Sequence, residues 1–182
     1  MKVLVVSDTH RKNDNYFTVL QMHKPDMVIH CGDAEGSEYA LTEAAGCPVQ
    51  IVLGNNDFFS ELPRELELEV GPYKVWVTHG HNYYVSMGNE TIKREAIARG
   101  ADIVMYGHTH RPVVDLEDDE VIAINPGSLS YPVVVRSSIR QQIHLCEPHA
   151  EIPERPCALT GDNALHGIVR LAGDGKQQIP RA

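Results

Sequence analysis

Five short apolar runs of this chain each end in a polar cluster that contains Asp, Asn or His. In chain order the clusters are Asp8-Thr9-His10, Gly32-Asp33, Gly54-Asn55-Asn56-Asp57, Thr78-His79-Gly80-His81 and Gly107-His108-Thr109-His110. In open α/β sheets, ligands collect beyond the carboxyl ends of the strands, where several loops present polar groups to one point. The sequence therefore predicts an architecture that brings these five clusters to one edge.

The first part of the chain alternates apolar strands with helices. The runs at residues 2–7, 26–31 and 48–53 are apolar almost throughout, and residues 14–23 and 37–45 between them have helical character. Apolar strands that alternate with helices are typical of parallel βαβ units whose sheet is covered on both faces. We therefore expect a parallel sheet here.

The pattern changes after Asn55. Residues 66–70 alternate Leu or Val with Glu, and a Gly-Pro turn leads into a second apolar run at 73–78, which predicts an antiparallel hairpin with one wet face. Asn89 is expected to cap a helix that runs to Arg99. Further strands are predicted at 102–106, 113–116 and 121–124. These elements together predict a mixed α/β sandwich.

Length and composition limit the class of protein. The chain has 182 residues, which argues for one compact domain, and its 42% hydrophobic content is typical of globular proteins. A net charge of -9 without a basic stripe disfavours strong binding to nucleic acid or an anionic membrane. The start of the chain lacks a signal-peptide pattern, and the four cysteines have no CxxC spacing. We expect a reduced cytoplasmic protein with no membrane segment.

Beyond Pro132 the periodic pattern is lost. Val133–Val135 is a candidate strand, but the rest of the chain contains scattered Pro and Gly without a sustained helix or strand period. The sequence therefore predicts one domain over residues 1–136, followed by an atypical, weakly ordered tail over 137–182. An unusual extension and a shifted reading frame are both compatible with this tail.

Each polar residue has an ordinary explanation when it is taken alone. An Asp or Asn after a strand is usually a turn residue or a helix cap, and a single strand-end histidine such as His30 is more often a satisfied polar side chain than a ligand. The joint pattern is more specific, because D-x-H and H-x-H place two side chains on the same side of an extended chain.

The donor types of the joint pattern indicate metal chemistry. Carboxylate, amide oxygen and imidazole together suit Mn²⁺, Fe²⁺, Ni²⁺ or Zn²⁺, and the absence of thiolate argues against a structural zinc site. Seven donors exceed what one ion needs, so we expect a pair of ions bridged by a carboxylate.

The order of the motifs resembles that of the calcineurin-like metallophosphoesterases, and within them the small bacterial and archaeal phosphodiesterase subgroup. The motifs are D-x-H, G-D, G-N-x-D, T-H-G-H and G-H-x-H, followed by Asn125-Pro126-Gly127-Ser128. The resemblance runs from Met1 to about Pro132. It implies an α/β (α+β) fold, a four-layer αββα sandwich with mixed sheets, and a binuclear centre. By position, it assigns one ion to Asp8, His10, Asp33 and His110 and the other to Asp33, Asn55, His79 and His108, with Asp33 as the bridge.

One departure from the family concerns the proton donor. Many larger members carry His where this chain has Asn56, and the small subgroup typically has Cys there. The acid that would assist the leaving group is therefore unidentified. His81 is the nearest alternative in the sequence, and a structural role for it is equally compatible. We take Asn56 and His81 as the candidate substrate-binding residues.

The resemblance implies hydrolysis of a small phosphoester, most readily a diester, by a hydroxide held between two divalent ions, with Mn²⁺ favoured. Nucleotides are among the candidate substrates, and no protein nucleophile is needed. The alternative is a non-catalytic interaction scaffold, as in the retromer coat subunit of this fold, which has lost ligands. Metal storage or sensing would require a His-rich or Cys-rich tract that this chain lacks. The sequence carries no indication of oligomeric state.

Overall fold

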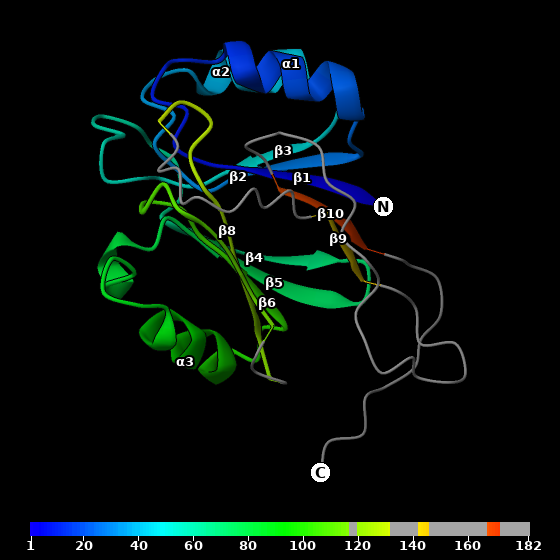
Figure 1. Ribbon diagram of the computed structural model, residues 1–182. Helices are drawn as coiled ribbons and strands as arrows, with labels where there is room; N and C mark the ends of the chain where they lie inside the picture. Colours follow the sequence, from blue (N-terminus) through cyan, green and yellow to red (C-terminus); the bar gives the residue numbers. More distant parts are fainter. Residues whose placement is uncertain (117–119, 132–141, 146–166, 172–182) are drawn as a thin grey trace.

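The computed structural model describes residues 1–116, 120–131, 142–145 and 167–171. Two five-stranded sheets pack face to face (Figure 1). Helices α1 (Asp14–His23) and α2 (Glu38–Ala45) cover the outer face of the first sheet, and α3 (Glu90–Ala98) covers the outer face of the second. This arrangement confirms the predicted four-layer αββα sandwich.

The first sheet has the strand order β3-β2-β1-β10-β9. Strands β1, β2 and β3 are parallel, whereas β10 runs antiparallel to β1 and parallel to β9. Their bounds are Lys2–Val6 (β1), Met27–His30 (β2), Val49–Ile51 (β3), Gln142–Leu145 (β9) and Gly167–Leu171 (β10). The sheet is therefore mixed, and β1 is its central strand.

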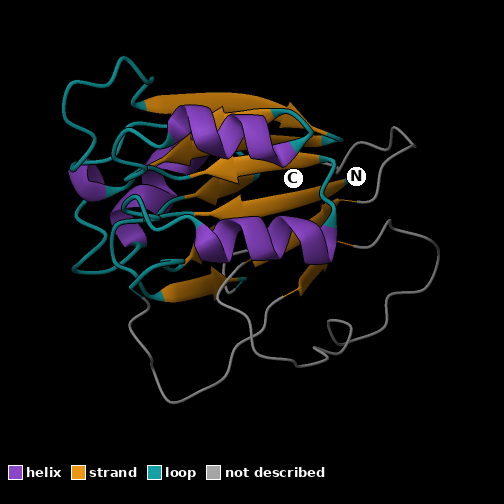
Figure 2. Ribbon diagram, turned by 90° about the horizontal axis from the view of Figure 1, so that it is seen from above, coloured by secondary structure: helices purple, strands orange, loops and turns teal. Residues whose placement is uncertain are grey.

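The second sheet has the order β4-β5-β6-β8-β7. The predicted hairpin is present as the antiparallel pair β4 and β5, while β5, β6 and β8 are parallel and β7 is antiparallel to β8. Their bounds are Glu65–Val70 (β4), Tyr73–Thr78 (β5), Ile103–Met105 (β6), Pro112–Asp115 (β7) and Ile122–Pro126 (β8). The loops that follow the parallel strands of both sheets gather at one edge of the sandwich (Figure 2).

Strand β1 shows how the sequence forms the layers. Val3 and Val5 pack in the core between the two sheets, and Leu4 and Val6 pack in the core under α1 and α2. All four side chains are buried, because alternate residues of a strand point to opposite faces and both faces of this sheet are covered. The apolar run at the start of the chain therefore places the first polar cluster at the end of a rigid central strand.

Helix α3 differs from the prediction at its first residue. Asn89 stands at the N-cap position, but its side chain makes no capping hydrogen bond. Its Nδ2 instead donates to Asp115 Oδ2 over 2.8 Å, which ties the helix to β7. The buried face of α3 packs Ile92 and Ala96 in one core with Trp76 of β5. Packing on the sheet and the tie to β7 therefore fix this helix.

Strands β9 and β10 lie within residues 137–182, where the sequence shows no sustained strand period. Strand β10 pairs with β1 from Lys2↔Arg170 to Val5↔Gly167, and this pairing, which local periodicity does not reveal, defines it as a strand. The candidate strand at Val133–Val135 lies outside the described residues. The domain boundary at residue 136 stays a prediction. Every helix in the described part of the chain is too short or too polar to traverse a lipid bilayer.

Candidate metal centre

The structure brings the seven predicted ligands together at the edge where the parallel strands end. Asp33 follows β2, Asn55 follows β3 and His79 follows β5, while β1 leads to Asp8 and His10 and β6 leads to His108 and His110. Both sheets therefore contribute donors to one site.

The first group of donors surrounds Asp8. Its Oδ1 lies 3.2 Å from His110 Nε2 and 3.8 Å from His10 Nε2, and the two Nε2 atoms are 3.2 Å apart. The three side chains meet the distance requirement for holding one cation. This group therefore combines Asp8 and His10 of the D-x-H motif with His110, the second histidine of the G-H-x-H motif.

The second group of donors surrounds Asn55. Its Oδ1 lies 3.0 Å from His79 Nε2 and 2.8 Å from His108 Nδ1. Asp33 Oδ2 is 3.5 Å from His79 Nε2, so a carboxylate completes this group. The structure thus combines carboxylate, amide and imidazole donors as the sequence predicts.

Two carboxylates stand between the groups. Asp33 Oδ2 is 3.9 Å from His10 Nε2 and 3.5 Å from His79 Nε2. Asp8 Oδ1 also reaches His79 Nε2, at 4.0 Å, so both Asp8 and Asp33 have imidazoles of both groups nearby. The bridging role of Asp33 stays a prediction.

The buried oxygen of Asp8 tests whether cations fit here. Asp8 Oδ1 is buried and makes no well-oriented hydrogen bond to the described residues, although three imidazole Nε2 atoms lie within 4.0 Å of it. A buried anionic oxygen without a partner is costly, and a cation among these donors would satisfy it. Oxygen and imidazole donors match the preferences of divalent transition metals. The residues present therefore fit a metal centre.

The electrostatics of the centre favour positive charge. Burial disfavours protonated His79, but its interactions with Asp33 and Asp8 outweigh that effect and raise the pKa of His79 above its ordinary value. Burial also disfavours ionised Asp33, yet its interaction with His79 and hydrogen bonds from Asn56 hold the pKa of Asp33 well below its usual range. The Asp8 carboxylate raises the pKa of His110. Protons thus bind where cations would also be attracted.

The backbone of the centre is strained. Five of the seven ligands have positive φ, a conformation that residues other than glycine rarely adopt. They are Asp8 (55°), His10 (45°), Asp33 (61°), His108 (69°) and His110 (56°). Strain of this kind costs on the order of 1 kcal/mol or more per residue and clusters at functional sites. Packing around these loops must hold the donors in place.

Gly54 illustrates that packing. A Cβ at residue 54 would lie 2.0 Å from Asp33 Oδ1 and 2.4 Å from the Asp33 nitrogen. A side chain at this position would displace the carboxylate that stands between the two donor groups. The glycine of G-N-x-D is therefore required by the close approach of two ligand loops.

Asp57 has a role that the sequence analysis did not assign. Its side chain is 5% exposed, and its Oδ2 accepts hydrogen bonds from the Asp33 nitrogen at 2.8 Å and the Gly54 nitrogen at 2.7 Å. Its Oδ1 accepts from the Glu35 nitrogen at 2.6 Å. Asp57 therefore joins the loop after β2 to the loop after β3. Its place in G-N-x-D was the only signal in the sequence.

Three further groups orient the imidazoles. Glu35 Oε1 lies 2.6 Å from His10 Nδ1, the Cys31 carbonyl lies 2.7 Å from His79 Nδ1, and the Tyr131 carbonyl lies 3.2 Å from His110 Nδ1. In each case the remaining ring nitrogen, Nε2, faces the centre. Such partners fix the tautomer and orientation of a ligating histidine. Two of them are backbone carbonyls, which sequence motifs cannot reveal.

The two candidate substrate-binding residues have different surroundings. Asn56 is turned toward Asp33, since its backbone nitrogen donates to Oδ1 at 2.8 Å and its Nδ2 to Oδ2 at 2.6 Å. The ring of His81 lies 5.4 Å from that of His79, and its Nδ1 is buried with no hydrogen-bond partner among the described residues. The structure thus places both beside the centre, with the backbone N–H and one side-chain N–H of Asn56 committed to Asp33.

His30 keeps the ordinary structural interpretation. It is buried, and its Nδ1 accepts a hydrogen bond from the Gly32 nitrogen at 3.2 Å while its Nε2 lies 3.1 Å from Thr9 Oγ1. Burial lowers the pKa of His30 to about 4, so the ring is neutral at physiological pH. It supports the loop that precedes Asp33 and is not a ligand.

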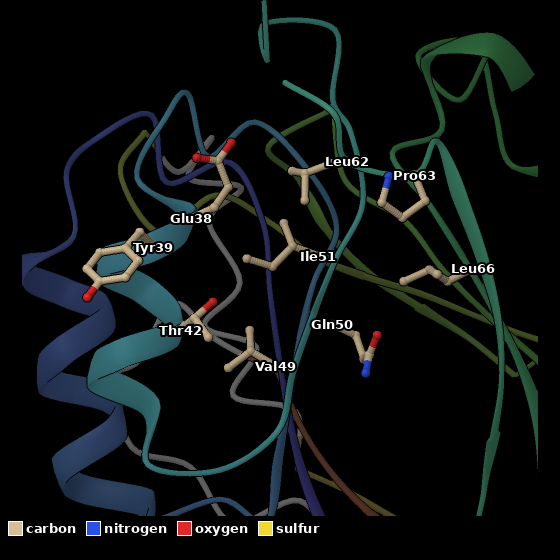
Figure 3. Close-up of a pocket in the computed structure, with 9 residues that line it drawn as sticks. All are labelled: Glu38, Tyr39, Thr42, Val49, Gln50, Ile51, Leu62, Pro63 and Leu66. Atoms are coloured by element: carbon tan, nitrogen blue, oxygen red, sulfur yellow. The ribbon is translucent and has the colours of Figure 1, made fainter. Parts of the chain in front are cut away.

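A surface cavity of about 380 Å³ lies elsewhere, beside the edge strand β3 (Figure 3). Its lining comes from α2, β3, the segment before β4 and β4 itself, and consists of Glu38, Tyr39, Thr42, Val49, Gln50, Ile51, Leu62, Pro63 and Leu66. None of the candidate ligands belongs to this lining, so the cavity is separate from the metal centre.

Comparisons with known proteins agree with this geometry. Residues 1–146 match the model of the calcineurin-like phosphoesterase superfamily domain. The chain is 34% identical over 139 residues to the probable metallophosphoesterase YsnB of Bacillus subtilis, covering 75% of this chain and 80% of that protein. It is 31% identical over 147 residues to the phosphodiesterase MJ0936 of Methanocaldococcus jannaschii, covering 70% and 83%. A solved structure of a predicted phosphoesterase from Streptococcus pneumoniae aligns with a TM-score of 0.63 at 32% identity, covering 76% of this chain and 77% of that one.

Proposed function

Because the chain belongs to the calcineurin-like phosphoesterase superfamily, we propose that it is a metal-dependent phosphodiesterase whose centre holds two divalent ions. The observation that carries this proposal is the convergence of imidazoles from both sheets on two buried carboxylates, Asp8 and Asp33. We assign Asp8, His10, Asp33 and His110 to one ion and Asp33, Asn55, His79 and His108 to the other.

The residues around the ligands hold the donors ready. Two bound ions would lower the pKa of a water molecule and stabilise charge on the phosphoryl oxygens. Glu35 and the Cys31 carbonyl keep the Nε2 atoms of His10 and His79 turned inward. Asp57 holds the loops of Asp33 and Asn55 together. The mixed oxygen and imidazole donors suit Mn²⁺, Fe²⁺, Ni²⁺ and Zn²⁺, and we take Mn²⁺ as the proposed metal.

Diesters are the preferred substrates in this proposal. The Asn56 amide donates one N–H to Asp33, and its second N–H is available to a phosphoryl oxygen. An amide cannot protonate a departing group, so among diesters those whose leaving group departs without a proton are favoured. His81, with its unpartnered Nδ1, is the second proposed contact for substrate. The phosphodiesterase named among the relatives supports this choice.

The scaffold alternative fits the structure less well. A protein that only presents a surface does not need two carboxylates buried among imidazoles, because such groups destabilise a fold unless a cation or proton satisfies them. All seven donors are present and converge. We therefore favour hydrolysis.

The test begins with protein stripped by a chelator and reloaded with Mn²⁺. We expect about two ions per chain and hydrolysis of bis(4-nitrophenyl) phosphate faster than 4-nitrophenyl phosphate. The matched pair of variants is Asp33→Asn, within the centre, and Asp26→Asn, on the exposed end before β2. Only the first should lose activity. A stoichiometry near zero after reloading would remove the basis of the proposal.

A further inference from the structure

Exposed apolar side chains are concentrated around the metal centre. Ten large hydrophobic residues are exposed among those described, and five of them stand on three loops at the edge that carries the ligands. These five are Phe58, Phe59, Tyr84, Met87 and Tyr131. Exposed apolar groups that gather at a polar site indicate a ligand with an apolar part.

Tyr131 is the member of this set with direct contacts to the ligands. Its carbonyl lies 3.2 Å from His110 Nδ1, and its ring packs edge-on against the His10 ring with 5.7 Å between centroids. The residue nevertheless remains 49% exposed. Half of Tyr131 is therefore available to a molecule bound at the first donor group.

Two serines hold Tyr131 at this place. Ser128 Oγ donates to the Asp8 carbonyl at 2.7 Å and accepts from the Tyr131 nitrogen at 2.9 Å. Ser130 Oγ donates to the Thr9 carbonyl. The loop after β8 is thus fastened to the loop after β1. A fixed aromatic side chain loses little entropy when a ligand packs on it.

Lys12 adds positive charge to the same rim. Its Nζ lies 4.0 Å from the centroid of the Tyr131 ring, within the range of a cation–π contact. The backbone of Lys12 belongs to the loop that Ser130 holds, since Ser130 Oγ also lies 3.2 Å from the Lys12 carbonyl. An aromatic ring and an ammonium group therefore stand together beside His10 and His110.

We propose that Tyr131 and Lys12 form a subsite for a planar aromatic group joined to the phosphate, so that the substrates are aromatic phosphoesters. This inference rests on the proposed function, because it places the phosphate at the metal centre. Tyr131 contacts the planar group, and Lys12 restrains the tyrosine ring and attracts the anionic ester. The aromatic group can be an aryl ester, joined directly, or a nucleobase, joined through a sugar.

Affinity for the Mn²⁺-loaded full chain tests the subsite with a readout other than activity. Calorimetry would compare phenyl phosphate with methyl phosphate, and AMP with ribose 5-phosphate, with inorganic phosphate as the reference. We expect the aromatic member of at least one pair to bind about three- to tenfold more tightly, as is typical of one aromatic contact. Preference within the first pair indicates aryl esters, and preference within the second indicates nucleotides.

Variants separate the tyrosine ring from a general effect on the fold. Tyr131→Leu should abolish the preference, so that the two members of each pair bind equally well, while Tyr131→Phe should keep it. The control is Tyr39→Leu, which removes a tyrosine that is 78% exposed on α2, and it should keep the preference. Equal affinities within both pairs, or a preference that survives in Tyr131→Leu, would overturn the subsite. If the preference holds but no diester is hydrolysed, the proposed function fails and the subsite stands.

Discussion

Replacing Asp57 should weaken the fold and the metal centre together. The carboxylate accepts three backbone hydrogen bonds, from Asp33, Gly54 and Glu35, at 2.6–2.8 Å. A buried donor left without its acceptor costs about 1–3 kcal/mol. Asp57→Ala leaves three such donors without an acceptor. Because the three costs are not fully additive, we expect the free energy of unfolding to fall by about 3–6 kcal/mol.

Asp57→Asn is the gentler change. Its amide oxygen can replace Oδ2, which accepts two of the bonds, while its NH₂ group then faces the Glu35 nitrogen. The Glu35 N–H is then left without an acceptor, which costs about 1–3 kcal/mol. Because Asp57 joins two ligand loops, we also expect the affinity for Mn²⁺ to fall by more than about tenfold, equivalent to about 1.4 kcal/mol.

Urea unfolding in chelator measures the first effect, and metal titration of the folded Asp57→Asn protein measures the second. Glu43→Gln, which alters an exposed carboxyl on α2, is the control and should change neither quantity. If the free energy of unfolding of Asp57→Ala lay within about 1 kcal/mol of that of the original protein, water would be satisfying these donors and the reasoning would be refuted.

Four further outcomes are expected. Asp33→Asn should lower turnover by at least about a hundredfold while costing less than about 2 kcal/mol of stability in chelator, because the amide keeps one acceptor for Asn56; early melting in chelator would make Asp33 chiefly structural. Asn56→His should raise monoesterase relative to diesterase activity, as measured on the two nitrophenyl esters, and an unchanged ratio would show that this position does not set the preference. Metal affinity should fall as pH drops from 8 to 6, because the raised pKa of His79 lets protons compete with the metal. In chelator the sign is opposite: the stability that protonated His79 contributes is present at low pH and is lost as pH rises through that pKa. Calorimetry at several pH values measures both effects. A chain ending at Arg136 should still bind metal, since all seven ligands precede that residue. It should be less soluble than the full chain, because the truncation leaves an edge of β1 unpaired. A metal-free product would contradict the domain boundary at residue 136.

Sequence reasoning places the candidate ligands at one edge of the fold, for a physical reason. Asp8, Asp33 and His79 each follow a run of apolar residues that can only be a covered strand, and parallel strands in a covered sheet end at the same edge. Strand position therefore fixes ligand position. The same logic predicts the hairpin of β4 and β5, where alternation is strict.

Contacts between distant segments are harder to predict. The acceptors that orient His79 and His110 are the carbonyls of Cys31 and Tyr131, and any residue type supplies a carbonyl. Strand β10 is defined by pairing with β1 across more than 160 residues of chain, which leaves no local period in the sequence. Asn89 has the identity of a helix cap but bonds to Asp115 instead. In each case tertiary contact decides the outcome.

The sharing of ligands between the two sheets has a consequence for the folded chain as a whole. His110 and Asp8 meet at the centre although about 100 residues separate them, and His110 Nε2 lies 3.2 Å from Asp8 Oδ1. Any ion held there would act as a cross-link that closes a loop of that length. For a disulfide, closing about 100 residues removes unfolded-state entropy worth roughly 4.7 kcal/mol. The two cysteines in the described part of the chain, Cys31 and Cys47, are free, so a metal ion would give this part of the chain the kind of cross-link that a disulfide gives a secreted protein.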